Sequence, residues 1–317
     1  MKGRGRIRFP GLVVVVASLA SFSCASAPQS DIQAHDFGLY GSAWIPWLRK
    51  NPTVADFIVY QAGPARPLKL IRNDLQFASD SGMKVILTLK LDKFSVPDSA
   101  VGRGVPSLEN FQRVLDHIED LPLSAITIGE ENVFWDGGSE RLAGLYEALR
   151  QRYPKRRFFQ WYSPSRNMNL PGLKWPVLPA DGWVFDQYFM PGHVYSEYVK
   201  GIASIDAPKI SIVWASPLWR PGEKNSESDF EWWDEDGWKL FYEQVRLNID
   251  HNIPTAFFLY EFEDSGLRPI PMFRSQDTCT LGFLDSLLNQ TIPALQTSVR
   301  LAALPAERPD WIPSGCR

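Results

Sequence analysis

The sequence Leu123-Pro-Leu-Ser-Ala-Ile-Thr-Ile-Gly-Glu-Glu-Asn-Val-Phe-Trp135 joins a short apolar run to a group of polar residues. Ile126 and Ile128 lie in a β-branched stretch that favours a strand, and Gly129 ends it. Side chains alternate between the two faces of a strand, so Glu131 faces away from Ile126 and Ile128 if those two pack against helices. The stretch therefore predicts a buried strand that presents a carboxylate at its carboxyl end.

Seven other short segments along the chain are also rich in apolar or aromatic residues and predict buried strands. With the first, the predicted strands are Gly38–Trp44, Asp56–Gln61, Lys84–Leu91, Ala125–Gly129, Arg157–Tyr162, Trp183–Tyr188, Lys209–Ala215 and Thr255–Phe262. Helical patterns lie between them, at Leu68–Ser79, after Ser107, and at Ser139–Gln151, Tyr195–Ile202, Gly237–His251 and Leu281–Leu301. Ser107 is expected to cap its helix, and Gly82 to end the one before it. The first crossover, around Trp47–Val54, is the shortest unit.

Repeated strand–helix alternation predicts an α/β fold, a single (β/α)₈ TIM barrel. No glycine-rich phosphate loop follows the first strand, which disfavours a nucleotide-binding fold. We divide the chain into a signal peptide at 1–24, a leader at 25–37, the barrel at 38–301 and an irregular tail at 302–317.

The amino terminus predicts export. Four basic residues (Lys2, Arg4, Arg6 and Arg8) precede an apolar run, residues 11–22, which is too short to span a bilayer. Cys24 follows small residues and is a candidate lipoprotein acceptor, so the mature protein is expected to be periplasmic, secreted or lipid-anchored at the cell surface. Cys279 and Cys316 would then be free to form a disulfide.

The amino-acid composition argues against several classes of function. The net charge of −3 and the lack of a basic cluster in the body of the chain argue against nucleic-acid binding. The sequence has 12 Trp, 10 Tyr and 19 Phe, and such rings suit surfaces that stack against sugars. Of the four histidines, only His193 is expected near the strand ends, so a zinc site or a Ser-His-Asp triad is disfavoured. We expect a carbohydrate partner, no metal and no cofactor, with membrane contact only through Cys24.

In a barrel, the carboxyl ends of the strands share one face, where active sites are built. The acids expected there are the catalytic candidates Glu130, Glu131, Asp186 and Glu261, together with Glu263, which is expected to bind substrate. The rings and amides expected to bind substrate are Trp44, Asn132, Trp135, Tyr162, Tyr188 and Trp214, and the second strand also offers Tyr60 and Gln61. Glycoside hydrolysis uses two carboxyls, one to protonate the leaving oxygen and one as nucleophile or base. Glu131 is the first choice for the acid, and Glu261, Asp186 and Glu130 remain open for the second role.

Gly129-Glu130-Glu131-Asn132 resembles the fourth-strand Gly-Asn-Glu-Pro motif of clan A glycoside hydrolases, which are (β/α)₈ barrels. The resemblance implies that Glu131 is the general acid/base. The match departs from the family at Glu130, which replaces the usual Asn. It departs again at the seventh strand, which has no Glu where clan A keeps its nucleophile.

The same stretch also resembles the fourth-strand Asp-Glu pair of substrate-assisted hexosaminidases. That resemblance implies that Glu131 is the acid and that Glu130 orients the substrate acetamide, with Tyr188 and Trp214 lining the pocket. Glu130 here stands in place of the family's Asp. A non-catalytic carbohydrate-binding barrel is the rival from another class, and the missing seventh-strand acid favours it.

Overall fold

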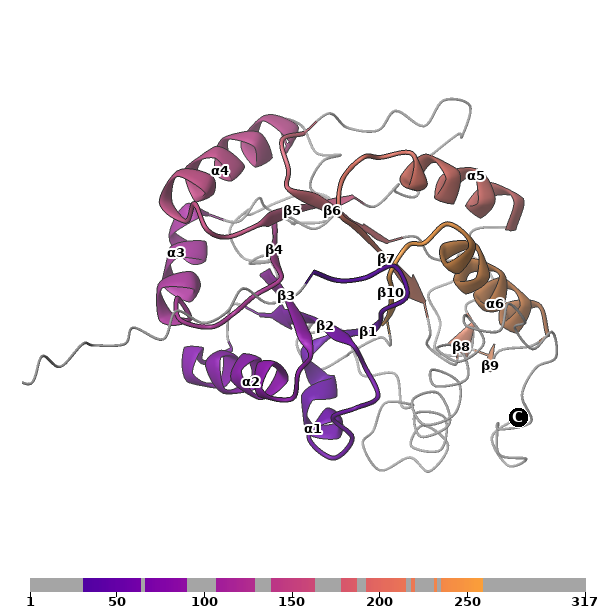
Figure 1. Cartoon of the computed structure of the whole chain (residues 1–317), viewed down its shortest axis with the longest axis horizontal. Coiled ribbons are helices and arrows are strands. Elements are labelled where there is room, and N and C mark those ends of the chain that lie inside the picture. The colour runs from indigo at the N-terminus through magenta and orange to yellow at the C-terminus, as the bar shows by residue number, and fades with distance from the viewer. Residues whose placement is uncertain are drawn as a thin grey trace, which may run out of the picture.

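The computed structural model describes residues 31–63, 66–89, 107–128, 138–162, 178–186, 192–214, 218–219, 231–232 and 235–258. Eight parallel strands among them close into a barrel in the order β1-β10-β7-β6-β5-β4-β3-β2, and helices surround it (Figure 1). The barrel strands are β1 Phe37–Tyr40, β2 Phe57–Ala62, β3 Lys84–Leu89, β4 Ala125–Ile128, β5 Phe158–Tyr162, β6 Gly182–Asp186, β7 Lys209–Trp214 and β10 Thr255–Phe258. The predicted barrel is therefore confirmed.

The helices follow the predicted alternation. They are α1 Ile45–Leu48, α2 Leu68–Asp80, α3 Leu108–His117, α4 Gly138–Arg152, α5 Gly192–Ala203 and α6 Glu235–Asp250. Ser107 caps α3 as expected, because its hydroxyl accepts a hydrogen bond from the Asn110 backbone N–H at 3.1 Å. Gly82 follows α2 with φ of 80°, a left-handed conformation that glycine adopts without strain. A two-stranded antiparallel sheet pairs β8 Leu218–Trp219 with β9 Glu231–Trp232. The helix predicted at Leu281–Leu301 lies outside the described residues.

The first strand is shorter than predicted. β1 ends at Tyr40, Gly41 has φ of 122°, and residues 42–44 form a short 3₁₀ helix, η1, in place of a strand. The backbone at Gly41 is left-handed, which turns the chain out of the sheet. The Trp44 indole N–H then donates to the Tyr40 carbonyl at 3.1 Å. An apolar run alone does not reveal this turn.

The barrel wall and the helices share most of the apolar core. Outward-facing strand residues such as Leu39, Ile58 and Leu87 pack with Ile71 of α2 and Phe111 of α3 in one large cluster. Burial of such side chains is the main favourable contribution to folding, at roughly 25 cal/mol per Å² of apolar surface.

A polar network fixes α5 and α6 to the barrel wall. The Tyr195 hydroxyl in α5 donates to the Asn248 side-chain oxygen in α6 at 3.0 Å. The Asn248 amide donates to the Thr255 hydroxyl in β10 at 3.2 Å, and the Tyr195 and Ser211 hydroxyls lie 3.2 Å apart. All four side chains are buried, so each needs these partners. The network therefore sets the position of two helices against β7 and β10.

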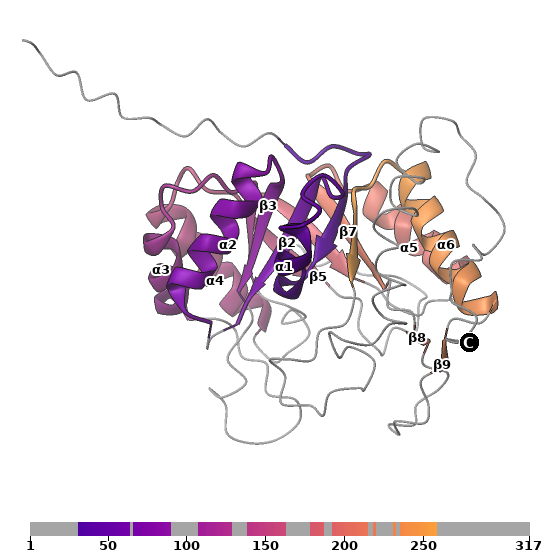
Figure 2. The same cartoon turned by 90° about the horizontal axis from the view of Figure 1, so that it is seen from below.

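A short segment closes one end of the barrel. Residues 31–36, the strap, cross the end at which the strands begin, and are drawn in indigo in Figure 2. Asp36 forms an ion pair with Lys84 of β3 at 2.5 Å, and Asp31 forms one with Arg157 at 2.5 Å. Ile32 packs against the side chains that fill the barrel interior. The strap is therefore fixed to the barrel by two ion pairs and one apolar contact.

Candidate active site at the carboxyl ends of the strands

One face of each strand fills the barrel interior. The interior cluster consists of Tyr40, Phe57, Val59, Ile86, Ala125, Phe159, Trp161, Val184, Ile210, Ile212 and Ala256. Residues between them along each strand, such as Ile58 or Ile126, belong to the outer core instead. This alternation is the expected consequence of strand geometry. It allows each strand end to be assigned to the interior or to the wall.

The fourth strand has the orientation that its sequence predicted. Ile126 and Ile128 pack in the outer core against the helices. Thr127 faces the other way, and its hydroxyl donates to the Thr88 hydroxyl of β3 at 3.0 Å. Both threonines are buried. The interior thus becomes polar toward the carboxyl ends of β3 and β4.

A second polar pair lies beside the first, on β1 and β2. The Gln61 side-chain amide donates to the Tyr40 hydroxyl at 2.7 Å. The Tyr40 ring packs edge-on against Phe258 of β10, with centroids 4.9 Å apart, and lies 5.4 Å from the Trp161 ring. The Trp161 indole N–H is buried and has no acceptor among the described residues. Sequence reasoning missed Tyr40 and Trp161, although the alternation of Phe37 and Leu39 with Tyr40 could have indicated the interior position of Tyr40.

Asp186 is the one candidate catalytic acid within the described residues. It ends β6, is 3% exposed, and pairs in register with Ile212 of β7. Strand alternation places it on the same side as Val184, which faces the interior. Its charge also acts on the outer side of the barrel, because the pKa of Tyr198 in α5 is raised by burial first and by Asp186 second. A buried carboxylate of this kind is costly unless it is used or compensated.

Two predicted substrate-binding rings belong to the core. Trp44 is 6% exposed and packs in the outer cluster. Tyr162 is 1% exposed and packs with Phe185 and Tyr198 between the wall and α5, where burial raises its pKa to about 12. The structure thus shows Trp44 and Tyr162 in packing clusters, and their predicted role in substrate binding stays a prediction. Trp44 left the strand at the Gly41 turn, and Tyr162 lies on the outward face of β5.

Alternation also separates Tyr60 from Gln61. Tyr60 faces the outer wall, where its hydroxyl donates to Asp74 of α2 at 3.0 Å. Arg66 donates to the same carboxylate at 2.8 Å and to the Ser42 hydroxyl at 3.2 Å. Burial, the largest single effect, lowers the pKa of Arg66, but the hydrogen bonds and charge interactions with Asp74 and Tyr60 together outweigh burial, so the pKa is raised. The Asp74 cluster thus braces the β1 and β2 ends from outside the barrel.

The remaining predicted residues are not placed by the structure. Those outside the described residues are Glu130, Glu131, Asn132, Trp135, Tyr188, Glu261 and Glu263. Trp214 is the last residue of β7, and its backbone pairs in register with Phe258 of β10. Within the described part of the chain, no group of three or more His, Cys, Asp or Glu could hold a metal ion. No helix in that part is long and apolar enough to cross a membrane.

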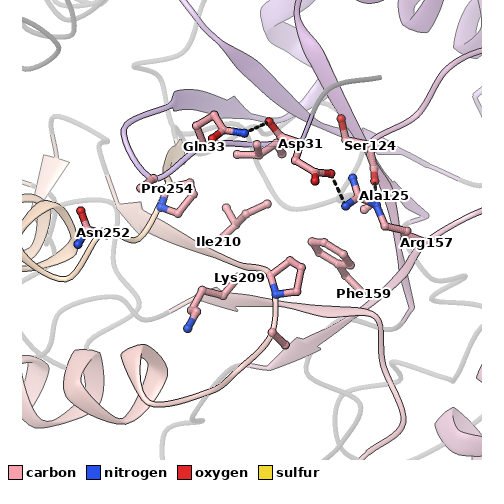
Figure 3. A pocket seen from close by; sticks show the side chains of 14 residues that line it. Asp31, Gln33, Ser124, Ala125, Arg157, Phe159, Lys209, Ile210, Asn252 and Pro254 are labelled. Atoms are coloured by element: carbon pink, nitrogen blue, oxygen red, sulfur yellow. Dashed lines mark hydrogen bonds and ion pairs between the residues drawn. The ribbon is translucent and has the colours of Figure 1, made fainter. Parts of the chain in front are cut away.

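A pocket of about 360 Å³ lies at the opposite, amino-terminal end of the barrel (Figure 3). The strap forms one side, and Phe159, Ile210 and Pro254 contribute apolar lining. Arg157 is held there by Asp31 and by the Ser124 carbonyl, to which its Nε donates at 2.8 Å. Features of this end of a TIM barrel usually serve stability, so we do not assign it the chemistry.

The comparisons with known proteins agree with the barrel. A GH5_18 protein from Bifidobacterium longum, solved in complex with Manβ1-4GlcNAc, matches with a TM-score of 0.53 and 13% identity, over 86% of this chain and 80% of that one. The catalytic domain of a mannanase from Streptomyces sp. SirexAA-E matches with a TM-score of 0.51 and 13% identity, over 81% and 87%. No family model and no curated protein matches the sequence. At this identity the matches show a shared fold, the (β/α)₈ barrel.

Proposed function

We propose that the protein is an exported glycoside hydrolase that acts on a poly- or oligosaccharide, with Glu131 as the general acid/base. The orientation of β4 carries the proposal. Ile126 and Ile128 face the helices and Thr127 faces the interior, as the sequence predicted. This agreement supports the proposal that Glu131, on the Thr127 side of the same alternation, is directed to the interior. TIM-barrel enzymes place their catalytic groups at the carboxyl ends of the strands.

The second carboxyl comes from Asp186, Glu261 or Glu130 in this proposal. Asp186 has the support of its interior-side position at the end of β6 and its burial. The solved barrels with similar folds include the mannanase domain and the mannose-containing complex, which makes β-linked glycans the first substrates to test.

The test compares the wild type with Glu131→Gln on unactivated glycans and on aryl glycosides, N-acetylhexosaminides included. Loss of the acid should slow unactivated glycans by roughly 10²–10⁴-fold, since their leaving oxygen needs a proton. Aryl glycosides with good leaving groups should lose much less. Glu140→Gln in α4 is the matched control, because Glu140 is exposed and its loss should leave both rates unchanged. Equal turnover of unactivated glycans by Glu131→Gln and wild type would refute the role of Glu131.

Two alternatives rest on β7. Its residues Lys209–Trp214 contain no carboxylate, although clan A enzymes, which the fourth-strand motif resembles, keep their nucleophile on that strand. A substrate-assisted mechanism, with Glu130 orienting an acetamide, needs no such group and would restrict turnover to N-acetylated substrates. A non-catalytic carbohydrate-binding barrel would bind glycans equally well in wild type and Glu131→Gln and hydrolyse none.

Export through residues 1–24 is part of the same proposal. The charge and apolar pattern of that segment supports it, and Cys24 is the proposed lipid acceptor. Fractionation of cells that express the full chain, with Cys24→Ser as the comparison, tests both points. A lipoprotein should move from the membrane fraction to the soluble exported fraction in Cys24→Ser, and wild type found in the cytoplasm would contradict export.

A further inference from the structure

The side chain of Tyr40 extends toward the carboxyl end of the barrel, where it meets Gln61. Tyr40 pairs in register with Val59, and Gln61 lies two residues further along β2. The Tyr40 hydroxyl nevertheless reaches the Gln61 amide at 2.7 Å. The phenol therefore extends along the inner wall toward the end at which the predicted acids gather.

The two side chains differ in burial. Tyr40 is 2% exposed, and rings on both sides hold it, Phe258 at 4.9 Å and Trp161 at 5.4 Å between centroids. Gln61 is only partly buried and is the residue of the pair that remains accessible. The buried tyrosine thus anchors the amide of a glutamine that is itself only partly buried.

Gln61 retains unused hydrogen-bonding capacity. A primary amide has two N–H donors and a carbonyl that accepts, and one donor is taken by Tyr40. Among the described residues, the second donor and the carbonyl of Gln61 have no partner. An amide with one free donor and one free acceptor, held in place by a third contact, matches a hydroxyl group, which also donates and accepts. Sugars present such hydroxyls at adjacent ring positions.

We propose that Gln61 binds a hydroxyl group of the bound sugar and that Tyr40 is a positioning residue that fixes the Gln61 amide. This inference rests on the proposed carbohydrate function and adds a specificity-determining residue on β2 to it. The ligand it selects is a sugar with a free hydroxyl directed at the β1–β2 side of the barrel. Ligands without that hydroxyl lose the contact.

The first measurement is glycan affinity by calorimetry, together with KM and kcat where turnover occurs, for wild type, Gln61→Leu and Tyr40→Phe. Gln61→Leu should weaken binding by about tenfold through loss of the hydrogen bonds, and should raise KM more than it lowers kcat. Tyr40→Phe should have a smaller effect in the same direction. The variant that combines both substitutions should bind glycan no more weakly than Gln61→Leu alone, because in this proposal Tyr40 acts on the ligand through Gln61.

The control is Tyr60→Phe, which removes a hydroxyl from the neighbouring residue on the outward face of the same strand. It should lower thermal stability through the contact with Asp74 and leave glycan affinity unchanged. A panel of monodeoxy ligands then locates the contact, because one of them should bind wild type and Gln61→Leu equally.

The outcomes separate this inference from the proposed function. Wild type that neither binds nor hydrolyses any glycan overturns the proposed function. Wild type that binds, with Gln61→Leu binding equally well, overturns the role of Gln61 and leaves the proposed function standing. Additive losses in the double variant overturn the positioning role of Tyr40. If Tyr40→Phe does not fold, Gln61→Leu and Gln61→Met with the deoxy panel decide the question, because neither changes the ring packing.

Discussion

The two ends of this barrel are built from the same alternating strands but carry different kinds of contact. At the amino-terminal end the interior receives Ile32, and charged groups are matched across the strap, Asp36 with Lys84 and Asp31 with Arg157. At the carboxyl end the interior side chains carry hydroxyls, an amide and a carboxylate. The amide is that of Gln61, which uses one N–H to bond Tyr40. Charged groups are therefore paired across the strap at one end, and a hydrogen-bonding amide is left available at the other.

This difference follows the division of labour found in TIM barrels, in which one face supports stability and the other holds the chemistry. The interior between the two ends is filled by large rings. Two glycines make space for them, since a Cβ on Gly38 would lie 2.5 Å from the Phe57 ring and one on Gly182 would lie 2.5 Å from the Phe159 ring. Added volume at Gly38 or Gly182 would therefore displace a ring of the packed interior.

The largest stability effect expected from this comparison is at Gly38. Gly38→Ala should lower the free energy of unfolding by about 1–3 kcal/mol, because the Phe57 ring must move within a packed interior. Urea unfolding measures the change. Gly144→Ala in α4 is the matched control, because its Cβ meets nothing within 4 Å and alanine favours a helix, so it should be neutral or stabilising by roughly 0.5–1 kcal/mol. Equal unfolding midpoints for the two variants would contradict the tight interior at Gly38.

The sequence predicted the strands well because their burial is nearly complete. Runs such as Lys84–Leu89 and Lys209–Trp214 carry apolar residues on both faces and few polar ones, as is typical of strands that are covered on one side by helices and on the other by a packed interior. Every predicted strand starts within one residue of an observed one. The ends were less certain, and the first strand was overextended because Gly41 turns the chain at a position where hydrophobicity continues through Trp44.

The site was harder to predict for a related reason. At a strand end, neighbouring residues face opposite sides, so a set of polar and aromatic residues near the end divides into interior and wall positions. Gln61 and Asp186 fall on the interior side, whereas Tyr60 and Tyr162 fall on the wall side. The sequence shows which polar and aromatic residues lie near a strand end. Which of them face the interior and which face the helices can be decided only when the strand boundaries and the register are known. Tyr40 was missed because the first strand was predicted to run on to Trp44, whereas β1 ends at Tyr40 itself.

The smallest effect concerns the strap. Asp36→Asn should remove the ion pair with Lys84 while keeping a side chain that can accept the Gln33 backbone N–H. Both partners of the ion pair are 14% exposed, so its loss should cost about 1 kcal/mol, between the values of surface and buried pairs. A double-mutant cycle with Lys84→Met isolates the pair from other effects of each change. Glycan affinity should not change, because the strap lies at the end opposite the proposed site. A coupling energy near zero would show that the Asp36–Lys84 pair does not hold the strap, and a loss of glycan affinity would show that the two ends of the barrel do not act independently.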